Sequence, residues 1–141
     1  MFKFLEKISS ENSILIIAFK GWSDAAEAAT SAVDTIIKNY DSKKFASFEE
    51  EEFFAFARER PNIKNSKDGR IIEWPNNDLY YIQDAIENTP LIILNGTEPH
   101  FKWKTFSKEV IDLCLSMNVT SVVTLGALLD SIPHTRGVKT Q

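Results

Sequence analysis

Three short apolar segments, each leading into a glycine-containing stretch, constrain the fold more than any other feature of this sequence. The segments are Ser13–Phe19, Leu91–Leu94 and Val119–Leu125, and the glycines that follow them are Gly21, Gly96 and Gly126. Continuous apolar runs rich in β-branched residues are typical of strands that are buried on both faces, as in a parallel sheet. We therefore expect three parallel strands whose following loops emerge at one edge of the sheet.

Helical patterns lie between these strands. Apolar residues recur at helical spacing over Ala25–Tyr40, and Asp24 with Glu27 three residues later matches a capping pair at its start. A second stripe covers Phe101–Met117 and includes Cys114, which is therefore predicted to be a core residue. Alternating strands and helices predict an α/β fold with a mainly parallel sheet and flanking helices.

The middle of the chain departs from this alternation. Lys44–Phe48 predicts a short strand, and the acidic run Glu49–Glu52 predicts a short helix, with an acidic patch that meets a partner as the alternative. The polar segment Asn62–Asp68 predicts a loop. Ile71–Trp74 then predicts a strand, and Leu79–Ile82 predicts a strand or a helical turn. We expect a small antiparallel excursion here.

Composition argues against several classes of protein. The formal net charge of -4 disfavours nucleic-acid binding, which requires a dense basic face. One cysteine and two histidines are too few for an internal disulfide, a CxxC site or a Cys/His zinc cluster. The longest apolar run, Ser13–Phe19, is too short to cross a bilayer and does not resemble a signal peptide. We expect a cytoplasmic protein without metal, cofactor, nucleic acid or membrane association.

Polar and aromatic residues gather on the stretches that follow the three strands. Ligands of open α/β sheets bind at the carboxyl ends of the strands, so these stretches predict a pocket or an interaction site. Its candidate residues are Gly21, Trp22, Asp24, Gly96, Glu98, Trp103, Gly126, His134 and Arg136. The alternative is structural: the glycines permit tight turns, the two acids act as caps, and the tryptophans belong to the core.

Catalytic motifs do not accompany these candidates. An acid paired with His134 would be suited to proton transfer. However, the sequence contains no GxSxG elbow, no GxxxxGK[ST] phosphate loop, no GxGxxG and no HExxH. No catalytic residue is therefore predicted, and an enzymatic activity is the less favoured reading.

Several short motifs follow one another in order over most of the chain. They are Gly21–Ala25, Arg60-Pro61, Gly69-Arg70, Trp74-Pro75, Asn95–Pro99 with Trp103 and Phe106, Leu125–Leu129, and Pro133–Arg136. In this order and spacing they resemble the PAC2 family, named for the proteasome assembly chaperone, and above all its bacterial, actinobacterial-type branch. Three positions depart from the family pattern: Lys102 stands in place of an arginine, Asp130-Ser131 is displaced, and Gly137 replaces a proline.

The resemblance implies a Rossmann-like α/β domain, similar to the phosphorylase/hydrolase fold, that self-associates. Eukaryotic and archaeal members of the family are proteasome assembly factors, which makes proteasome subunits candidate partners. Family members are about twice as long, so residues 1–141 are expected to be the N-terminal half of a longer PAC2-like domain, truncated at the C-terminus.

Two functional hypotheses follow. The favoured one is a protein-interaction role, either assembly-chaperone-like or proteasome-accessory, without catalytic activity. The alternative is a small-molecule-binding protein or an enzyme that uses the crevice at the carboxyl ends of the strands.

Overall fold

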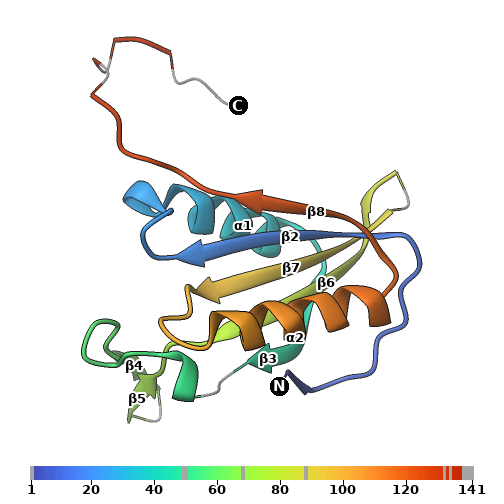
Figure 1. Ribbon diagram of the computed structural model, residues 1–141, viewed down its shortest axis with the longest axis horizontal. Coiled ribbons are helices and arrows are strands. Elements are labelled where there is room, and N and C mark those ends of the chain that lie inside the picture. Colours follow the sequence, from blue (N-terminus) through green and yellow to red (C-terminus); the bar gives the residue numbers. More distant parts are fainter. Residues whose placement is uncertain are drawn as a thin grey trace.

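The computed structural model describes residues 2–48, 51–67, 69–87, 89–131, 133 and 135–137. Six strands form one mixed sheet with the order β1-β3-β6-β7-β2-β8 (Figure 1). The strands are β1 (Lys3–Phe4), β2 (Ser13–Lys20), β3 (Ser42–Phe48), β6 (Asn77–Ile86), β7 (Thr89–Thr97) and β8 (Val119–Leu125). The helices are α1 (Ala28–Asn39) and α2 (Trp103–Ser116), and the α/β class predicted from the sequence is confirmed.

The parallel half of the sheet consists of the three strands that the apolar segments predicted. β2 is the central strand of the three, and it pairs in parallel with β7 on one side and with β8 on the other. Leu15 lies opposite Ile92 in the first pairing and opposite Val122 in the second. β7 is longer than predicted, so that Gly96 lies inside it, opposite Phe19, rather than in the following loop.

The antiparallel half is larger than the sequence predicted, so the expectation of a mainly parallel sheet is corrected. β1 pairs with β3, β3 with β6 and β6 with β7, and all three pairings are antiparallel. The physical reason is the short connection between β6 and β7, in which Ile86 pairs with Thr89. A connection of this length turns the chain back on itself and cannot make the crossover that parallel strands need.

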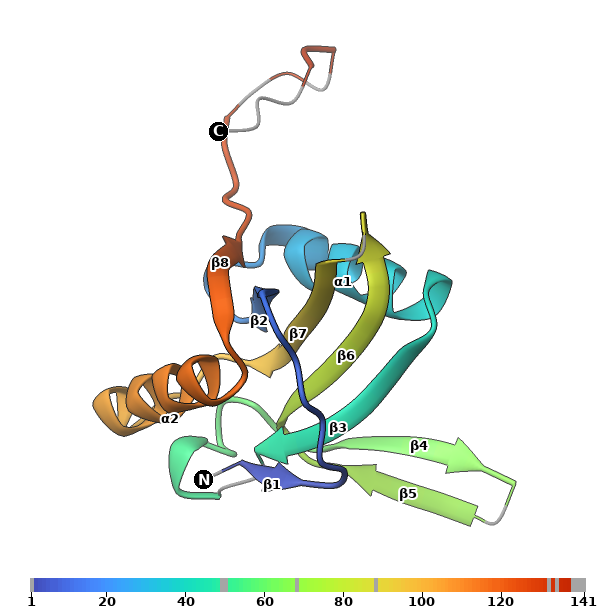
Figure 2. The same cartoon turned by 90° about the vertical axis from the view of Figure 1, so that its right-hand side faces the viewer.

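A separate hairpin replaces the loop predicted over Asn62–Asp68. β4 (Asn62–Ser66) pairs with β5 (Gly69–Glu73), and the two strands stand out from the main sheet (Figure 2). Every residue of both strands is exposed, which explains why no buried pattern marked β4. Of the helix predicted at Glu49–Glu52, residues 49 and 50 lie outside the described residues, and Glu51–Phe53 forms a short 3-10 turn, η2.

The two helices cover opposite faces of the sheet (Figure 2). The α2 face carries an aromatic core in which Phe48, Phe53 and Phe106 are buried. Cys114 is half-buried against this core, as predicted for the α2 stripe, and burial raises the pKa of its thiol. The α1 face is lined by smaller aliphatic side chains, among them Ala29 and Val33.

β8 forms one edge of the sheet and is exposed along most of its length. Val122 and Val123 point to opposite faces, and they are 53% and 44% exposed. The strand contains no charged residue, no proline and no glycine. Natural edge strands are usually protected by such residues, so this edge is chemically open to pairing with another strand.

Candidate functional site

The ends of β2 and β7 meet as the sequence predicted. Lys20 lies opposite Thr97 in the parallel register, and the Glu98 N–H donates to the Lys20 carbonyl at 2.9 Å. The backbone N–H of Trp22 in turn donates to the Glu98 carboxylate, at 3.3 Å from Oε2. Trp22 and Glu98 are 76 residues apart in the chain, and the sheet makes them neighbours.

The end of β8 joins the same group of loops. Asp24 and Ala127 form a parallel bridge, in which the Ala25 N–H donates to the Ala127 carbonyl at 3.0 Å. The Ala127 N–H donates back to the Ser23 carbonyl at 2.7 Å. Gly126 therefore lies beside the loop that carries Trp22. The prediction that the three stretches share one edge of the sheet is confirmed.

Close packing explains two of the three predicted glycines. A Cβ at Gly96 would lie 2.1 Å from Oδ1 of the buried Asn77 and 2.4 Å from the Asn76 carbonyl oxygen. A Cβ at Gly21 would lie 2.6 Å from Oε2 of Glu98. Side chains at these positions would push neighbouring strands or the Glu98 carboxylate out of place. Both glycines therefore shape the site without contributing a functional group to it.

Asp24 has a structural role as a helix cap. Its Oδ1 accepts hydrogen bonds from the N–H groups of Ala29 and Thr30, at 2.7 and 3.2 Å, and its Oδ2 accepts one from the Thr30 hydroxyl at 2.5 Å. The predicted pairing with Glu27 does not occur, because Ala26 and Glu27 adopt left-handed angles and delay the start of α1. The buried carboxylate faces the first turn of α1, where the helix dipole favours negative charge.

A pocket of about 370 Å³ forms where the loops after β2 and β7 meet the start of α2. Four of the predicted residues line it: Gly21, Trp22, Glu98 and Trp103. Two other lining residues, Thr97 and Pro99, belong to the Asn95–Pro99 motif, and the sequence did not single out the remaining ones, which are Lys20, Arg58, Glu59 and His100. Trp22 is 82% exposed and Trp103 is 49% exposed, so both indoles lie at the surface rather than in the core. We call this the tryptophan pocket.

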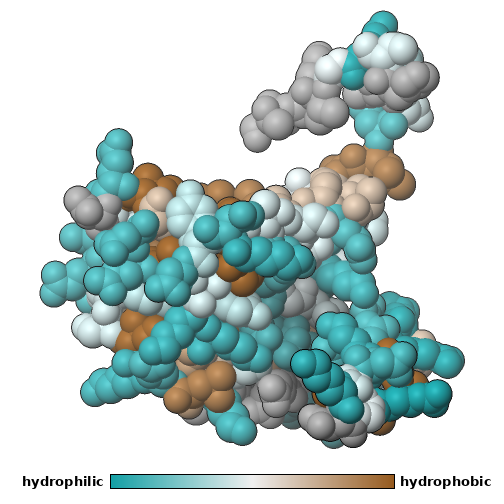
Figure 3. All heavy atoms as spheres, turned by 180° about the vertical axis from the view of Figure 1, so that it is seen from behind, coloured by the Kyte–Doolittle hydropathy of each residue, from teal (hydrophilic) through white to brown (hydrophobic). Residues whose placement is uncertain are grey.

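A larger cleft of about 1250 Å³ adjoins the tryptophan pocket and was missed by the sequence analysis. It lies between α1 and the β4–β5 hairpin, and the two cavities share Lys20, Glu59 and Thr97. Lys20 and Glu59 form an ion pair at 3.0 Å, and this contact raises the pKa of Lys20. The surface on the side of the molecule opposite α2 is largely hydrophilic (Figure 3). The cleft was missed because only the Ile71–Trp74 part of its hairpin wall was predicted to be a strand, whereas Asn62–Asp68 was predicted to be a loop.

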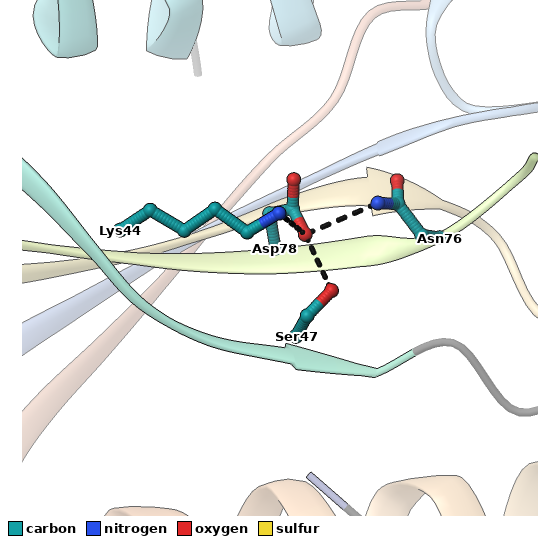
Figure 4. Close-up of polar contacts among 4 residues, drawn as sticks. All are labelled: Lys44, Ser47, Asn76 and Asp78. Carbon is teal, nitrogen blue, oxygen red and sulfur yellow. Dashed lines mark hydrogen bonds and ion pairs between the residues drawn. The ribbon is translucent and has the colours of Figure 1, made fainter. Parts of the chain in front are cut away.

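The floor of the cleft is a polar network on β3 and β6 (Figure 4). Oδ1 of Asp78 accepts hydrogen bonds from the Ser47 hydroxyl at 2.6 Å and from the Asn76 amide at 3.1 Å. The ammonium of Lys44 lies 2.7 Å from the same oxygen. Burial, together with Asp78 and Asp34, raises the pKa of the neighbouring Tyr80. The Asp78 carboxylate therefore helps to hold β3 and β6 together.

Arg136, one of the last two predicted site residues, is not among the residues that line the tryptophan pocket. His134 lies outside the described residues. Arg136 is exposed, and its N–H donates to the nearby Pro133 carbonyl at 2.9 Å. The described part of this segment leads away from the sheet (Figure 1).

Two further properties concern the described residues as a whole. Within them, no group of three or more His, Cys, Asp and Glu side chains is arranged to hold a metal ion. None of the described helices has the length and apolar character needed to span a membrane.

Comparison with solved structures identifies relatives from actinobacteria. A proteasome-assembly chaperone homologue from Mycobacterium tuberculosis is 29% identical, with a TM-score of 0.80, over 87% of this chain and 52% of its own. A PAC2 family protein from Streptomyces avermitilis is 31% identical, with a TM-score of 0.78, over 89% of this chain and 54% of its own. A Corynebacterium glutamicum protein of unknown function is 27% identical, with a TM-score of 0.83, over 96% and 53%.

The chain thus spans about half the length of these solved relatives. No curated protein matches it. The model of the PAC2 family matches residues 18–141, which include the end of β2, the whole of β7 and β8, and both helices. On this match, the chain belongs to the PAC2 family.

Proposed function

We propose that this PAC2 family protein acts in the cytoplasm by binding another protein through the tryptophan pocket, in an assembly-chaperone-like or proteasome-accessory role. The observation that carries the proposal is the exposure of Trp22 and Trp103 around one pocket. Tryptophan is among the residues that contribute most to protein interfaces, and exposing it to water is unfavourable unless a partner covers it.

Several hydrogen bonds hold the loop that carries Trp22 in place. The loop with Trp22 is tied to β7 through Glu98, to the end of β8 through Ala127 and to α1 through Asp24. A surface that is ordered before binding loses little conformational entropy when a partner arrives. This favours recognition of a defined protein surface.

Proteasome subunits are the first candidate partners, because one relative is named as a proteasome-assembly chaperone homologue. Self-association is the second interaction we propose. The exposed edge of β8 supports it, since the strand offers unprotected backbone groups and uncharged side chains.

A small-molecule-binding or enzymatic role in the large cleft is the second candidate. The cleft supports it by the polar groups that line it. However, its volume of about 1250 Å³ exceeds the range of roughly 300–1,000 Å³ that is typical of small-molecule sites. The three lysines that line it, Lys20, Lys44 and Lys64, are each paired with an acid. We therefore rank it below the protein-interaction role.

The test is affinity capture from the cytosol of the native host, quantified by mass spectrometry. We expect the double variant Trp22→Ala/Trp103→Ala to lose at least about 90% of the captured partner, as expected when interface tryptophans are truncated. Tyr40→Ala is the matched control, because Tyr40 is 49% exposed but follows the far end of α1. Circular dichroism confirms that each variant folds. Capture that is unchanged in the double variant, or lost equally in Tyr40→Ala, would contradict the proposal.

A further inference from the structure

The two indoles of the tryptophan pocket lie at the surface of the molecule. Among the described residues, neither Trp22 nor Trp103 contacts another aromatic ring, whereas Trp74 packs edge-on against Phe56 with ring centroids 4.9 Å apart. The face of an indole carries partial negative charge and attracts a cation within about 6 Å. Two such indoles line one cavity here.

A carboxylate lines the same pocket as these two tryptophans. Glu98 is half-buried, and its Oε2 accepts a hydrogen bond from the backbone N–H of Trp22 at 3.3 Å. Within the described residues, no lysine, arginine or histidine forms an ion pair with it. Because a partly desolvated carboxylate attracts a cation more strongly than a fully solvated one does, the pocket favours positive charge.

Two of the three basic residues that line the pocket, Lys20 and Arg58, do not cancel this preference, and the third is the partly buried His100. Lys20 is already neutralised by Glu59 at 3.0 Å. Arg58 is exposed, so water screens its charge and its side chain is free to extend into solvent. The half-buried Glu98 is therefore the charge that an entering group meets inside the pocket.

The size of the pocket limits the entering group. A volume of about 370 Å³ is close to the lower end of the range for ligand sites and accommodates one extended side chain. An anionic group would be repelled by Glu98, and a neutral apolar group would leave the carboxylate without a countercharge.

We propose that the tryptophan pocket binds an alkylammonium group, namely a lysine side chain presented by the partner protein. The ammonium lies against the faces of Trp22 and Trp103 and pairs with the Glu98 carboxylate. This inference rests on the proposed function and specifies the chemistry of the partner at this pocket.

The three tryptophans make a direct test possible. In a ¹⁵N-labelled sample of residues 1–141, each indole N–H gives one NMR signal, and Trp74 serves as an internal reference. The probe is N-acetyl-lysine methylamide, and its uncharged counterpart is N-acetyl-norleucine methylamide, which has a side chain of the same kind without the ammonium. We expect saturable shifts at Trp22 and Trp103 with the lysine derivative, and affinity for the norleucine derivative lower by about tenfold.

Charge variants complete the test. Glu98→Gln is expected to weaken binding of the lysine derivative by about tenfold, since it removes the pairing carboxylate. Glu109→Gln makes the same charge change on α2 outside the pocket and is expected to leave the affinity unchanged. Equal affinity for the two derivatives, absence of saturable shifts at Trp22 and Trp103, or equal effects of the two variants would overturn the inference.

The outcome is independent of the capture experiment. If Trp22→Ala/Trp103→Ala abolishes partner capture while the lysine derivative fails to bind, the lysine inference is overturned and the protein-interaction role stands. If the lysine derivative binds as expected and the double variant retains its partner, the pocket chemistry is supported and the proposed function is overturned.

Discussion

Different kinds of side chain pack on the two faces of the sheet. The α2 face is filled with phenylalanines, and Phe48 contacts Phe53 and Phe106 with ring centroids 4.8 and 5.1 Å apart. The α1 face carries small side chains such as Ala29 and Val33, and its surface over β3 and β6 is polar and open. The comparison indicates that the fold is stabilised mainly on the α2 face, which leaves the other face free to form a cleft.

Truncating a core residue on each face tests this comparison most strongly. Phe48→Ala is expected to lower the free energy of unfolding by about 3–5 kcal/mol, because it leaves a cavity among buried rings. Val33→Ala, on the α1 face, is expected to cost about 2 kcal/mol, in line with the smaller volume removed. Urea unfolding followed by circular dichroism measures both.

Phe101→Ala is the matched control for Phe48, because Phe101 is 53% exposed and is expected to contribute less than about 1 kcal/mol. A loss for Val33→Ala as large as that for Phe48→Ala would show that the two faces contribute equally, and the comparison would fail.

The two helices also begin differently, which gives a second test. α1 is capped by Asp24, whereas α2 begins after the left-handed Lys102 without a side-chain cap. Asp24→Ala is expected to lower the free energy of unfolding by about 1–2 kcal/mol, since it leaves the first N–H groups of α1 without their acceptor.

The companion variant Thr30→Val removes one donor to Asp24 and keeps the carboxylate. It is expected to cost less than Asp24→Ala in the same urea assay. If the two variants lose equal stability, the hydroxyl contact rather than the capping of the helix dominates at Asp24.

The smallest expected effect concerns pH and the open part of the α1 face. Burial, followed by the charges of Asp78 and Asp34, raises the pKa of Tyr80 above its ordinary value of 10.0. The folded state therefore favours the neutral phenol, and this contribution to stability is complete below pH 10 and is lost as the pH rises through the folded pKa.

Tyr80→Phe is expected to abolish this part of the alkaline loss of stability, measured as urea midpoints between about pH 9 and pH 11. Ultraviolet titration of the phenolate, with the variant subtracted, reports the pKa of Tyr80 directly. A phenol that ionises at or below its ordinary value would show that this face is fully solvated at Tyr80.

The sequence predicted those parts of the fold that are marked by a local pattern of residues. The strand Ser13–Lys20 was visible because it is apolar along its length, and the glycine-rich ends of the parallel strands placed Trp22 next to Glu98. Of the hairpin β4–β5, the strand predicted over Ile71–Trp74 corresponds to β5, whereas β4 could not be predicted because its residues are exposed and polar.

The cleft escaped prediction for a related reason. Asp78 acquires its β3 partners, Ser47 and Lys44, only after β6 has paired with β3, and nothing near Asp78 in the sequence indicates this. The cap of α1 was assigned to the correct acid but to the wrong helical residues, since the left-handed turn at Ala26 and Glu27 moves the helix start by one turn.

That left-handed turn has a consequence for how the molecule meets a partner. Ala26 and Glu27 hold φ angles of 54° and 56°, which cost each of these non-glycine residues on the order of 1 kcal/mol. Interactions in the folded state offset this strain, because the Asp24 cap and the bridge to Ala127 hold the turn in place. Replacing either residue by glycine would relieve the strain and at the same time loosen the segment, so a more stable variant would be expected to associate more weakly.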